Sequence, residues 1–400
     1  MNKVNVFWFR RDLRLEDNMG LYHALNAGLK VIPIFIFDQE ILNRLQNKQD
    51  RRVDYIHQAL QRIHNDLKKY NSGLHVYYGT PMDVFKKITE DFTVDTVFSN
   101  RDYEPHAIQR DRQIADFLLM HHILFRNFKD QVIFEKNNIL KNDLSPYTVF
   151  TPYSKKWKEN LSSIESVAPN MENFADYNGT SEIISLKEIG FEKTDLDFAE
   201  PELDKKIVDS YGDYRDFPAL DRTTHLGIAL RFGTISIRKC VQYAVKHNET
   251  WLNELIWREF FMQILYHFPS VVHHCFKKKY ENIVWRNNET EFKAWCEGRT
   301  GYPIVDAGMR QLNETGLMHN RVRMITASFL TKHLLIDWRW GEAYFAEKLL
   351  DYAYEQTKKF DKDLQYIRKW LPEEYAEEPI VEHTKARERA LKAYKDALAE

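Results

Sequence analysis

Short apolar runs alternate with amphipathic segments from the N-terminus to about Asp130. Five runs of strand length are rich in β-branched and aromatic residues, namely 4–9, 31–37, 74–78, 95–99 and 123–127. Between them, residues 18–27 and 51–70 show helical periodicity. This alternation predicts a parallel sheet with helices on both faces. No G-x-G-x-x-G or G-x-x-x-x-G-K-[ST] loop follows any of these strands, so the usual phosphate-loop signature of nucleotide-binding folds is missing.

The pattern changes after residue 131. The periodicity weakens over 132–209, where Asn, Ser, Pro and acidic residues become more frequent, which indicates a long connection. Beyond residue 210 strand signals nearly vanish, and runs at 251–268, 326–335 and 385–400 predict helices. We therefore expect an α/β plus all-α protein, with a Rossmann-like parallel α/β domain at 1–131, a linker at 132–200 and an all-helical domain at 201–400.

Composition narrows the class of protein. The net charge is −2, so binding to nucleic acid would need a local basic surface. Three widely spaced cysteines argue against a disulfide framework and a cysteine-rich zinc site, and no histidine or carboxylate spacing predicts another metal site. No apolar run approaches the length of a membrane span. We therefore expect a cytoplasmic protein with no membrane-spanning helix. The 9 Trp, 21 Tyr and 25 Phe residues are enough to line a cavity as well as to fill two cores.

Polar residues crowd one helical segment, GLMHNRVRM at 316–324. His319, Asn320, Arg321 and Arg323 fall within five positions, so they cannot all share one solvent face. Some must point inward, where an unpaired polar group is costly. A ligand or an internal partner has to satisfy them.

Two further segments combine polar and aromatic residues. In WLNELIWREFF at 251–261, Trp251, Glu254 and Arg258 share one helical face, with Trp257 nearby, which suits either a packed aromatic helix or a cavity wall. In the segment 211–236, hydroxyl and backbone N–H groups that suit phosphate are offered by Thr223, Thr224, Gly227 and Gly233. The same residues would alternatively belong to an ordinary capped helix–turn–helix.

Together, FWFRRDLRLEDN, WLNELIWREFF, the segment 300–345 and FDKDLQYIRKWLP resemble the DNA photolyase/cryptochrome family over nearly the whole chain. The resemblance implies a folded FAD in the helical domain. For the α/β domain it leaves the antenna chromophore open: a deazaflavin, a flavin or none. It implies DNA containing pyrimidine dimers as the partner, and we expect a monomer. The implied reaction is light-driven repair of cyclobutane pyrimidine dimers by electron transfer from reduced FAD, the activity of a deoxyribodipyrimidine photo-lyase.

The resemblance also assigns roles to individual residues. The residues matching the family's flavin contacts are Tyr211, Thr223, Thr224, His225, Leu226, Gly227, Trp251, Arg258, Arg323 and Asp351. Those matching its DNA contacts are Glu254, Trp257, Asn320 and Arg321. For catalysis, Glu254 would hydrogen-bond the flipped dimer, Asn320 and Met324 indicate a cyclobutane-dimer enzyme, and Trp285 and Trp338 match the outer and middle members of an electron-transfer chain.

The chain also departs from the family pattern. Relatives have a second aspartate two residues after the one at Asp351, where this chain has Ala353, and about two dozen following residues have no counterpart here, an apparent deletion near 352–356. The innermost tryptophan and a flavin-facing asparagine would lie in that gap. Two alternatives to repair therefore stay open: a cryptochrome-like protein that binds flavin or damaged DNA without repairing it, and an inert scaffold.

Overall fold

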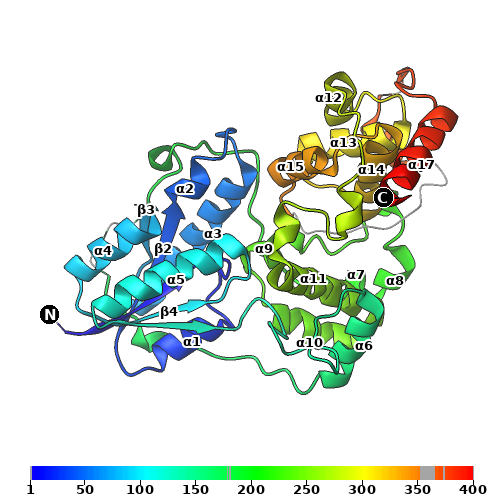
Figure 1. The fold of residues 1–400 in the computed structure, drawn as a ribbon. Helices are drawn as coiled ribbons and strands as arrows, with labels where there is room; N and C mark the ends of the chain where they lie inside the picture. The colour runs from blue at the N-terminus through cyan, green and yellow to red at the C-terminus, as the bar shows by residue number, and fades with distance from the viewer. Residues whose placement is uncertain (1, 178, 180–181, 352–364, 373, 400) are drawn as a thin grey trace. The chain divides into compact units, whose positions relative to one another are not determined.

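The computed structural model describes the whole chain except residues 1, 178, 180–181, 352–364, 373 and 400 (Figure 1). The described chain divides into two compact units. Unit 1 comprises Met1–Leu203 and Ile228–His267, and unit 2 comprises Asp204–Gly227 and Phe268–Glu400. None of the described helices is long and apolar enough to cross a membrane.

Unit 1 is built on a five-stranded parallel sheet with the strand order β3-β2-β1-β4-β5. The strands are β1 (Val4–Phe9), β2 (Val31–Asp38), β3 (His75–Gly79), β4 (Val94–Asn100) and β5 (Leu124–Phe128). Each lies within one residue of a run expected from the sequence. The order runs outward from β1 in both directions, so the sheet has a topological switch point between β1 and β4.

Helices cover both faces of the sheet, as the alternation predicts. One face packs α1 (Met19–Leu25) and α3 (Arg51–Leu67) against inward residues such as Phe7 and Phe35. The other packs α4 (Pro81–Asp91) and α5 (Pro105–Met120) against Trp8 and Ile34. The predicted fold class is confirmed: the chain up to β5 forms a doubly wound α/β domain. The remaining short helices of this region are α2 (Gln39–Leu42) and the 3₁₀ turn Lys68–Tyr70.

The connection after β5 packs along unit 1. It contains α6 (Phe150–Asn160) and the 3₁₀ turns Met171–Asn173 and Lys187–Ile189. Phe174, Leu186 and Phe191 are buried in the same hydrophobic cluster as α1 and α3. The periodicity of this connection is weak because it contributes only single apolar side chains to a core that α1, α3 and the sheet form. Unit 1 is completed by α9 (Gly227–Phe232), of which it holds the residues from Ile228 onward, α10 (Ile237–His247) and α11 (Glu249–His267).

The regular elements of unit 2 are all helical within its described residues, as expected. They are α7 (Lys205–Asp209), α8 (Tyr211–Tyr214), α12 (Glu289–Glu297), α13 (Pro303–Thr315), α14 (Asn320–Ser328), α15 (Trp338–Lys348), α16 (Gln365–Trp370), α17 (His383–Ala399), the 3₁₀ turns Pro218–Leu220, Pro269–Val272 and Lys278–Tyr280, and the π-helical turn Phe329–His333. The core of unit 2 surrounds Trp295, which is fully buried and donates its indole N–H to the Thr326 carbonyl at 3.1 Å.

The helix expected over 326–335 is present over 326–333 and ends two residues early. The α-helix ends at Ser328, continues as the π-helical turn over Phe329–His333, and stops before Leu335, whose φ of +52° is left-handed. A left-handed residue cannot continue a right-handed helix. Leu334, Leu335 and Ile336 are buried beyond the end of the helix, so these apolar residues belong to the core without being helical.

Candidate functional site

The predicted site residues fall into both units, and each set is described within its own unit. Unit 1 carries Trp251, Glu254, Trp257 and Arg258, all on α11. This helix is capped by Asn248, whose side-chain oxygen accepts from the backbone N–H of Trp251 at 2.9 Å. Trp251 is buried, whereas Glu254, Trp257 and Arg258 are half-buried. The helical face predicted from the sequence is therefore partly accessible from outside the core.

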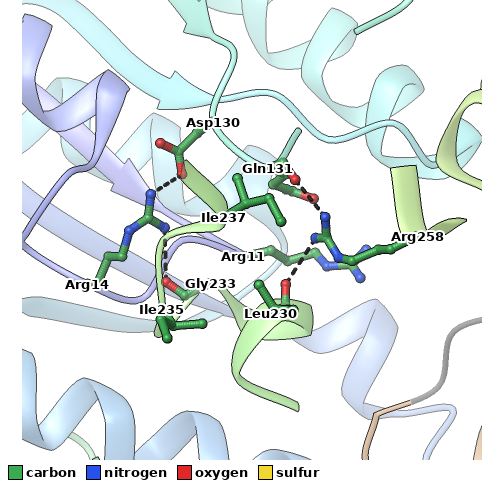
Figure 2. A pocket seen from close by; sticks show the side chains of 9 residues that line it. All are labelled: Arg11, Arg14, Asp130, Gln131, Leu230, Gly233, Ile235, Ile237 and Arg258. Atoms are coloured by element: carbon green, nitrogen blue, oxygen red, sulfur yellow. Dashed lines mark hydrogen bonds and ion pairs between the residues drawn. The ribbon is translucent and has the colours of Figure 1, made fainter. Parts of the chain in front are cut away.

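Arg258 binds backbone carbonyls of unit 1. It donates through Nη1 to Gln131 O at 2.7 Å and through Nη2 to Leu230 O at 3.1 Å. The guanidinium lines a small hollow together with Arg11 and Arg14 (Figure 2). Burial, and then the nearby charge of Arg11, lower the pKa of Arg258 to about 10. In this arrangement Arg258 links α11 to α9 and to the start of the connection after β5. Its expected contact with flavin stays a prediction.

Glu259, the next residue, is a buried carboxylate that sequence reasoning missed. It is 2% exposed. It accepts from the N–H groups of Ile133 at 2.6 Å and Phe134 at 3.1 Å, and from the Trp157 indole at 2.6 Å and the Tyr153 hydroxyl at 3.3 Å. Burial raises its pKa to about 7 against the opposing effect of these donors. We call Glu259 with its four donors the Glu259 cluster; it joins α11, α6 and the connection after β5.

Trp257, predicted as a stacking wall, already stacks on another ring in the structure. Its indole lies parallel to Phe150 of α6, with centroids 3.6 Å apart and planes 6° apart. Phe261 lies near Trp257 at 5.3 Å and 23°. The sequence offered no signal for Phe150, because this residue lies far from Trp257 along the chain, in a segment of weak periodicity. The stacked pair forms an aromatic surface of the type that binds bases.

In unit 2, one compact loop holds most of the predicted pyrophosphate contacts. Tyr211, Thr223, Thr224 and His225 are partly or fully exposed, and Leu226 is buried. His225 has a left-handed φ of +50°, and its Nε2 lies 2.6 Å from Asp221 Oδ1. Such a turn exposes backbone N–H groups, which suits an anion.

Gly227 closes this loop against Asp351. A Cβ atom at Gly227 would lie 2.6 Å from the Asp351 Cβ, so only glycine permits the approach. Asp351 Oδ1 in turn accepts from Arg323 Nη2 at 2.9 Å. Three predicted cofactor residues, Gly227, Arg323 and Asp351, are thus brought together from three separate segments of the chain.

The polar segment 316–324 finds part of its partners within the chain. Arg323 is 9% exposed and pairs with Asp351, and Arg321 donates through Nε to Asp216 Oδ1 at 2.6 Å. His319 caps α14, with Nδ1 accepting from the Arg321 N–H at 3.2 Å. Burial and then the charge of Arg321 lower the pKa of His319 to about 4, so it is neutral at pH 7.

Arg323 Nε is one of the buried polar atoms of this segment that have no hydrogen-bond partner within the described part of the chain. Buried polar groups are almost always hydrogen-bonded. Together with the close approach at Gly227, this orphaned donor fits a bound group that offers hydrogen-bond acceptors, as the FAD implied by the resemblance would. Asn320 is half-buried and Met324 is buried on the same helix.

The two predicted electron-transfer tryptophans are both half-buried in unit 2. Trp338 donates its indole N–H to Cys275 Sγ at 3.3 Å, and the Arg339 guanidinium lies 4.9 Å from its ring centroid. Trp285 meets Tyr394 of α17 edge-on at 6.3 Å. The predicted gap near 352–356 and Ala353 lie outside the described residues. Within the described ranges, no group of three or more His, Cys, Asp or Glu side chains could hold a metal ion.

Comparisons with known proteins identify one family. Residues 5–172 match the family model described as DNA photolyase, and residues 251–357 match the FAD binding domain of DNA photolyase. A deoxyribodipyrimidine photo-lyase of Synechococcus sp. is 33% identical over 92% of this chain and 87% of its own length. That of Escherichia coli is 31% identical over 98% of this chain and 99% of its own length.

Solved structures share the whole fold. A bacterial class III photolyase from Agrobacterium tumefaciens superposes with a TM-score of 0.87 at 29% identity, covering 100% of this chain and 98% of the other. The photolyase from Sulfolobus tokodaii, solved with two FAD molecules, gives a TM-score of 0.83 at 30% identity, covering 99% of this chain and 100% of the other. The family models and the relatives of 30% identity or more show that the chain belongs to the DNA photolyase family.

Proposed function

We propose that this protein repairs cyclobutane pyrimidine dimers in DNA, using light and a reduced FAD. The observation that carries the proposal is the arrangement of Gly227, Asp351 and Arg323, which brings distant predicted cofactor residues together. Family membership supports it, because curated relatives that align with nearly this whole chain are named deoxyribodipyrimidine photo-lyases.

The residues of the chain would bind and orient the reacting groups. Bound FAD would supply the light-driven electron transfer. Arg323, held by Asp351, offers guanidinium N–H groups to flavin oxygens or nitrogens, and the loop 221–227 offers backbone N–H groups to its phosphates. Glu254 would accept a hydrogen bond from the extruded dimer, and the ring surface around Trp257 would stack on it.

Trp285 and Trp338 would carry electrons toward the flavin from the surface of unit 2. Both are half-buried, which suits residues between a surface and an interior. We further propose that unit 1 takes an antenna chromophore. The photolyase from Sulfolobus tokodaii was solved with two FAD molecules, which implied a novel light-harvesting cofactor. A second flavin is therefore one candidate for that chromophore. A cytoplasmic monomer is part of the same proposal.

A repair assay tests the proposed function directly. Purified, chemically reduced protein is mixed with an oligonucleotide that contains one thymine dimer, and dimer loss is followed in blue light and in the dark. We expect turnover only in light, a large loss of it in Glu254→Gln, and little change in the control Glu249→Gln, an exposed residue on the same helix. Flavin released by heat should approach one FAD per chain.

A second candidate is binding of flavin or damaged DNA without repair. One observation favours it: the alignment with the Escherichia coli enzyme runs over 475 positions, whereas this chain has 400 residues. At least 75 positions of that alignment therefore have no residue in this chain. Flavin retention with a preference for dimer-containing DNA, but without light-dependent repair, would support this second function and refute the first.

A further inference from the structure

Asp216 contacts the side chains of two arginines in unit 2. Its Oδ1 accepts from Arg321 Nε at 2.6 Å and also pairs with Arg321 Nη2. The Nε of Arg215 lies 3.6 Å from the same oxygen. The Asp216 side chain is 37% exposed, whereas those of Arg321 and Arg215 are 13% and 20% exposed. One partly exposed carboxylate thus holds two mostly covered guanidinium groups.

Arg321 needs such a partner because of its place in the fold. It stands in the first turn of α14, where the helix dipole is positive and disfavours a cation. Its neighbour His319 is neutral at pH 7 and so adds no second positive charge beside Arg321. The paired carboxylate of Asp216 therefore stabilises the Arg321 charge at this helix end.

The geometry of the contact also fixes the direction of the guanidinium. A guanidinium is a planar fork, and a carboxylate on its Nε and Nη2 edge sets the orientation of the plane. The fork can then meet a phosphate or a base edge without first losing the rotamer freedom of a long side chain. Exposed rings lie in the same stretch of chain, with Tyr214 40% and Phe217 50% exposed.

We propose that Asp216 is a positioning residue for lesion recognition: it holds Arg321 in the orientation that distinguishes dimer-containing from undamaged DNA. The proposal rests on the proposed function, in which Arg321 contacts damaged DNA. The negative charge of Asp216 at the same time repels the DNA backbone, whose attraction for protein is electrostatic and independent of sequence. Asp216 therefore weakens general binding and sharpens specific binding.

Because these effects are opposed, Asp216→Asn should change the affinity for undamaged DNA and the preference for dimer-containing DNA in different directions. Without the charge, undamaged DNA should bind as well as in the wild type or more tightly. Without the fixed guanidinium, the preference for dimer-containing DNA should fall at least about fivefold, the loss of one oriented charged contact. Asp213→Asn is the matched control, because Asp213 is exposed, lies three residues away and carries the same charge.

The test measures the affinities of the full-length protein for one duplex with and without a single thymine dimer, across a salt series and in the dark. A preference that falls in Asp216→Asn and stays within about twofold in Asp213→Asn supports the proposal. An unchanged preference, or equal changes in both variants, overturns it. If the wild type shows no preference at all, the proposed function fails and this inference fails with it.

Thermal melts of each variant separate positioning from folding. If Asp216→Asn does not fold, Asp216→Glu serves in its place, because it keeps the charge but moves the carboxylate by one methylene. Its preference for the dimer should then fall while its affinity for undamaged DNA stays that of the wild type. A preference equal to that of the wild type in Asp216→Glu overturns the proposal.

Discussion

Replacing Glu259 with glutamine should stabilise the protein increasingly, relative to the wild type, as the pH rises from 5 to 8. Glu259 is 2% exposed and accepts from four donors on the connection after β5 and on α6. Its pKa is nevertheless raised to about 7, because the cost of burying the charge exceeds what the donors return. Glutamine has nearly the same shape and cannot ionise.

The magnitude follows from the two pKa values. An unfolded chain ionises Glu259 near its ordinary value of 4.5, whereas the folded chain keeps the proton up to about 7. Between these values the folded state binds more protons than the unfolded state, so the stability of the wild type falls as the pH rises. The interval corresponds to about 3 kcal/mol, fully expressed above pH 7 and absent below pH 4.5. The glutamine variant lacks this loss of stability. The other titrating groups are common to both proteins, so their contributions to the pH dependence cancel when the two unfolding free energies are subtracted.

Urea unfolding of both proteins at several pH values measures the difference, with tryptophan fluorescence as the signal. Trp157 lies in the Glu259 cluster, so the signal includes this region. Glu249→Gln, at an exposed position of the same helix, should show little dependence of this kind. A difference between variant and wild type that stays flat with pH, or that falls as the pH rises, would refute the reasoning. It would mean that the four donors outweigh burial and hold the Glu259 pKa at or below its ordinary value.

Three further changes test the packing of unit 2. Gly227→Ala would place a Cβ 2.6 Å from that of Asp351, so we expect a loss of about 1–3 kcal/mol in unfolding free energy and of bound flavin, measured by melting and by flavin release. Asp306→Ala removes a buried acceptor of two backbone N–H groups and two hydroxyls, which should cost at least about 3 kcal/mol in urea unfolding. Trp295→Ala leaves a cavity in the core and removes the hydrogen bond to Thr326, so we expect the unfolding free energy to fall by about 3–5 kcal/mol in the same measurement.

Each of these predictions has a clear contrary outcome. Gly79→Ala is the control for Gly227→Ala, since a Cβ at Gly79 would meet its nearest neighbour at an ordinary 3.4 Å. Equal melting temperatures for the two alanine variants would contradict the close approach at Gly227. A cost below about 1 kcal/mol for Asp306→Ala or Trp295→Ala would contradict the burial of these side chains.

The fold of unit 1 was predictable because its signals are local. Each strand of a sheet covered on both faces is a short apolar run, and each helix has one apolar stripe, so runs such as 4–9 and 51–70 identify their elements directly. The end of the helix expected over 326–335 was placed two residues too late, because apolar residues continue beyond His333. Apolar periodicity indicates burial, and Leu334 and Leu335 are buried although the helix ends before them.

The candidate site was predictable only as a set of residues. The resemblance assigned roles to Gly227, Arg323 and Asp351, yet nothing in the sequence shows that a side chain at residue 227 would collide with residue 351. Residues without a motif were missed altogether. Phe150 faces Trp257, Asp216 holds Arg321, and Glu259 collects four donors, all through contacts between residues far apart in the sequence.

The sequence by itself determined the order of elements, the parallel α/β class of the N-terminal domain and the family. Periodicity and long motifs are local properties of the chain, so they can be identified without the tertiary structure. Only the tertiary structure decided which charges are paired, which rings are stacked and which carboxylate is buried. The free energies of those groups depend on their surroundings: the pKa of Glu259 is set by what covers it, and the direction of Arg321 by an aspartate from a distant segment of the chain.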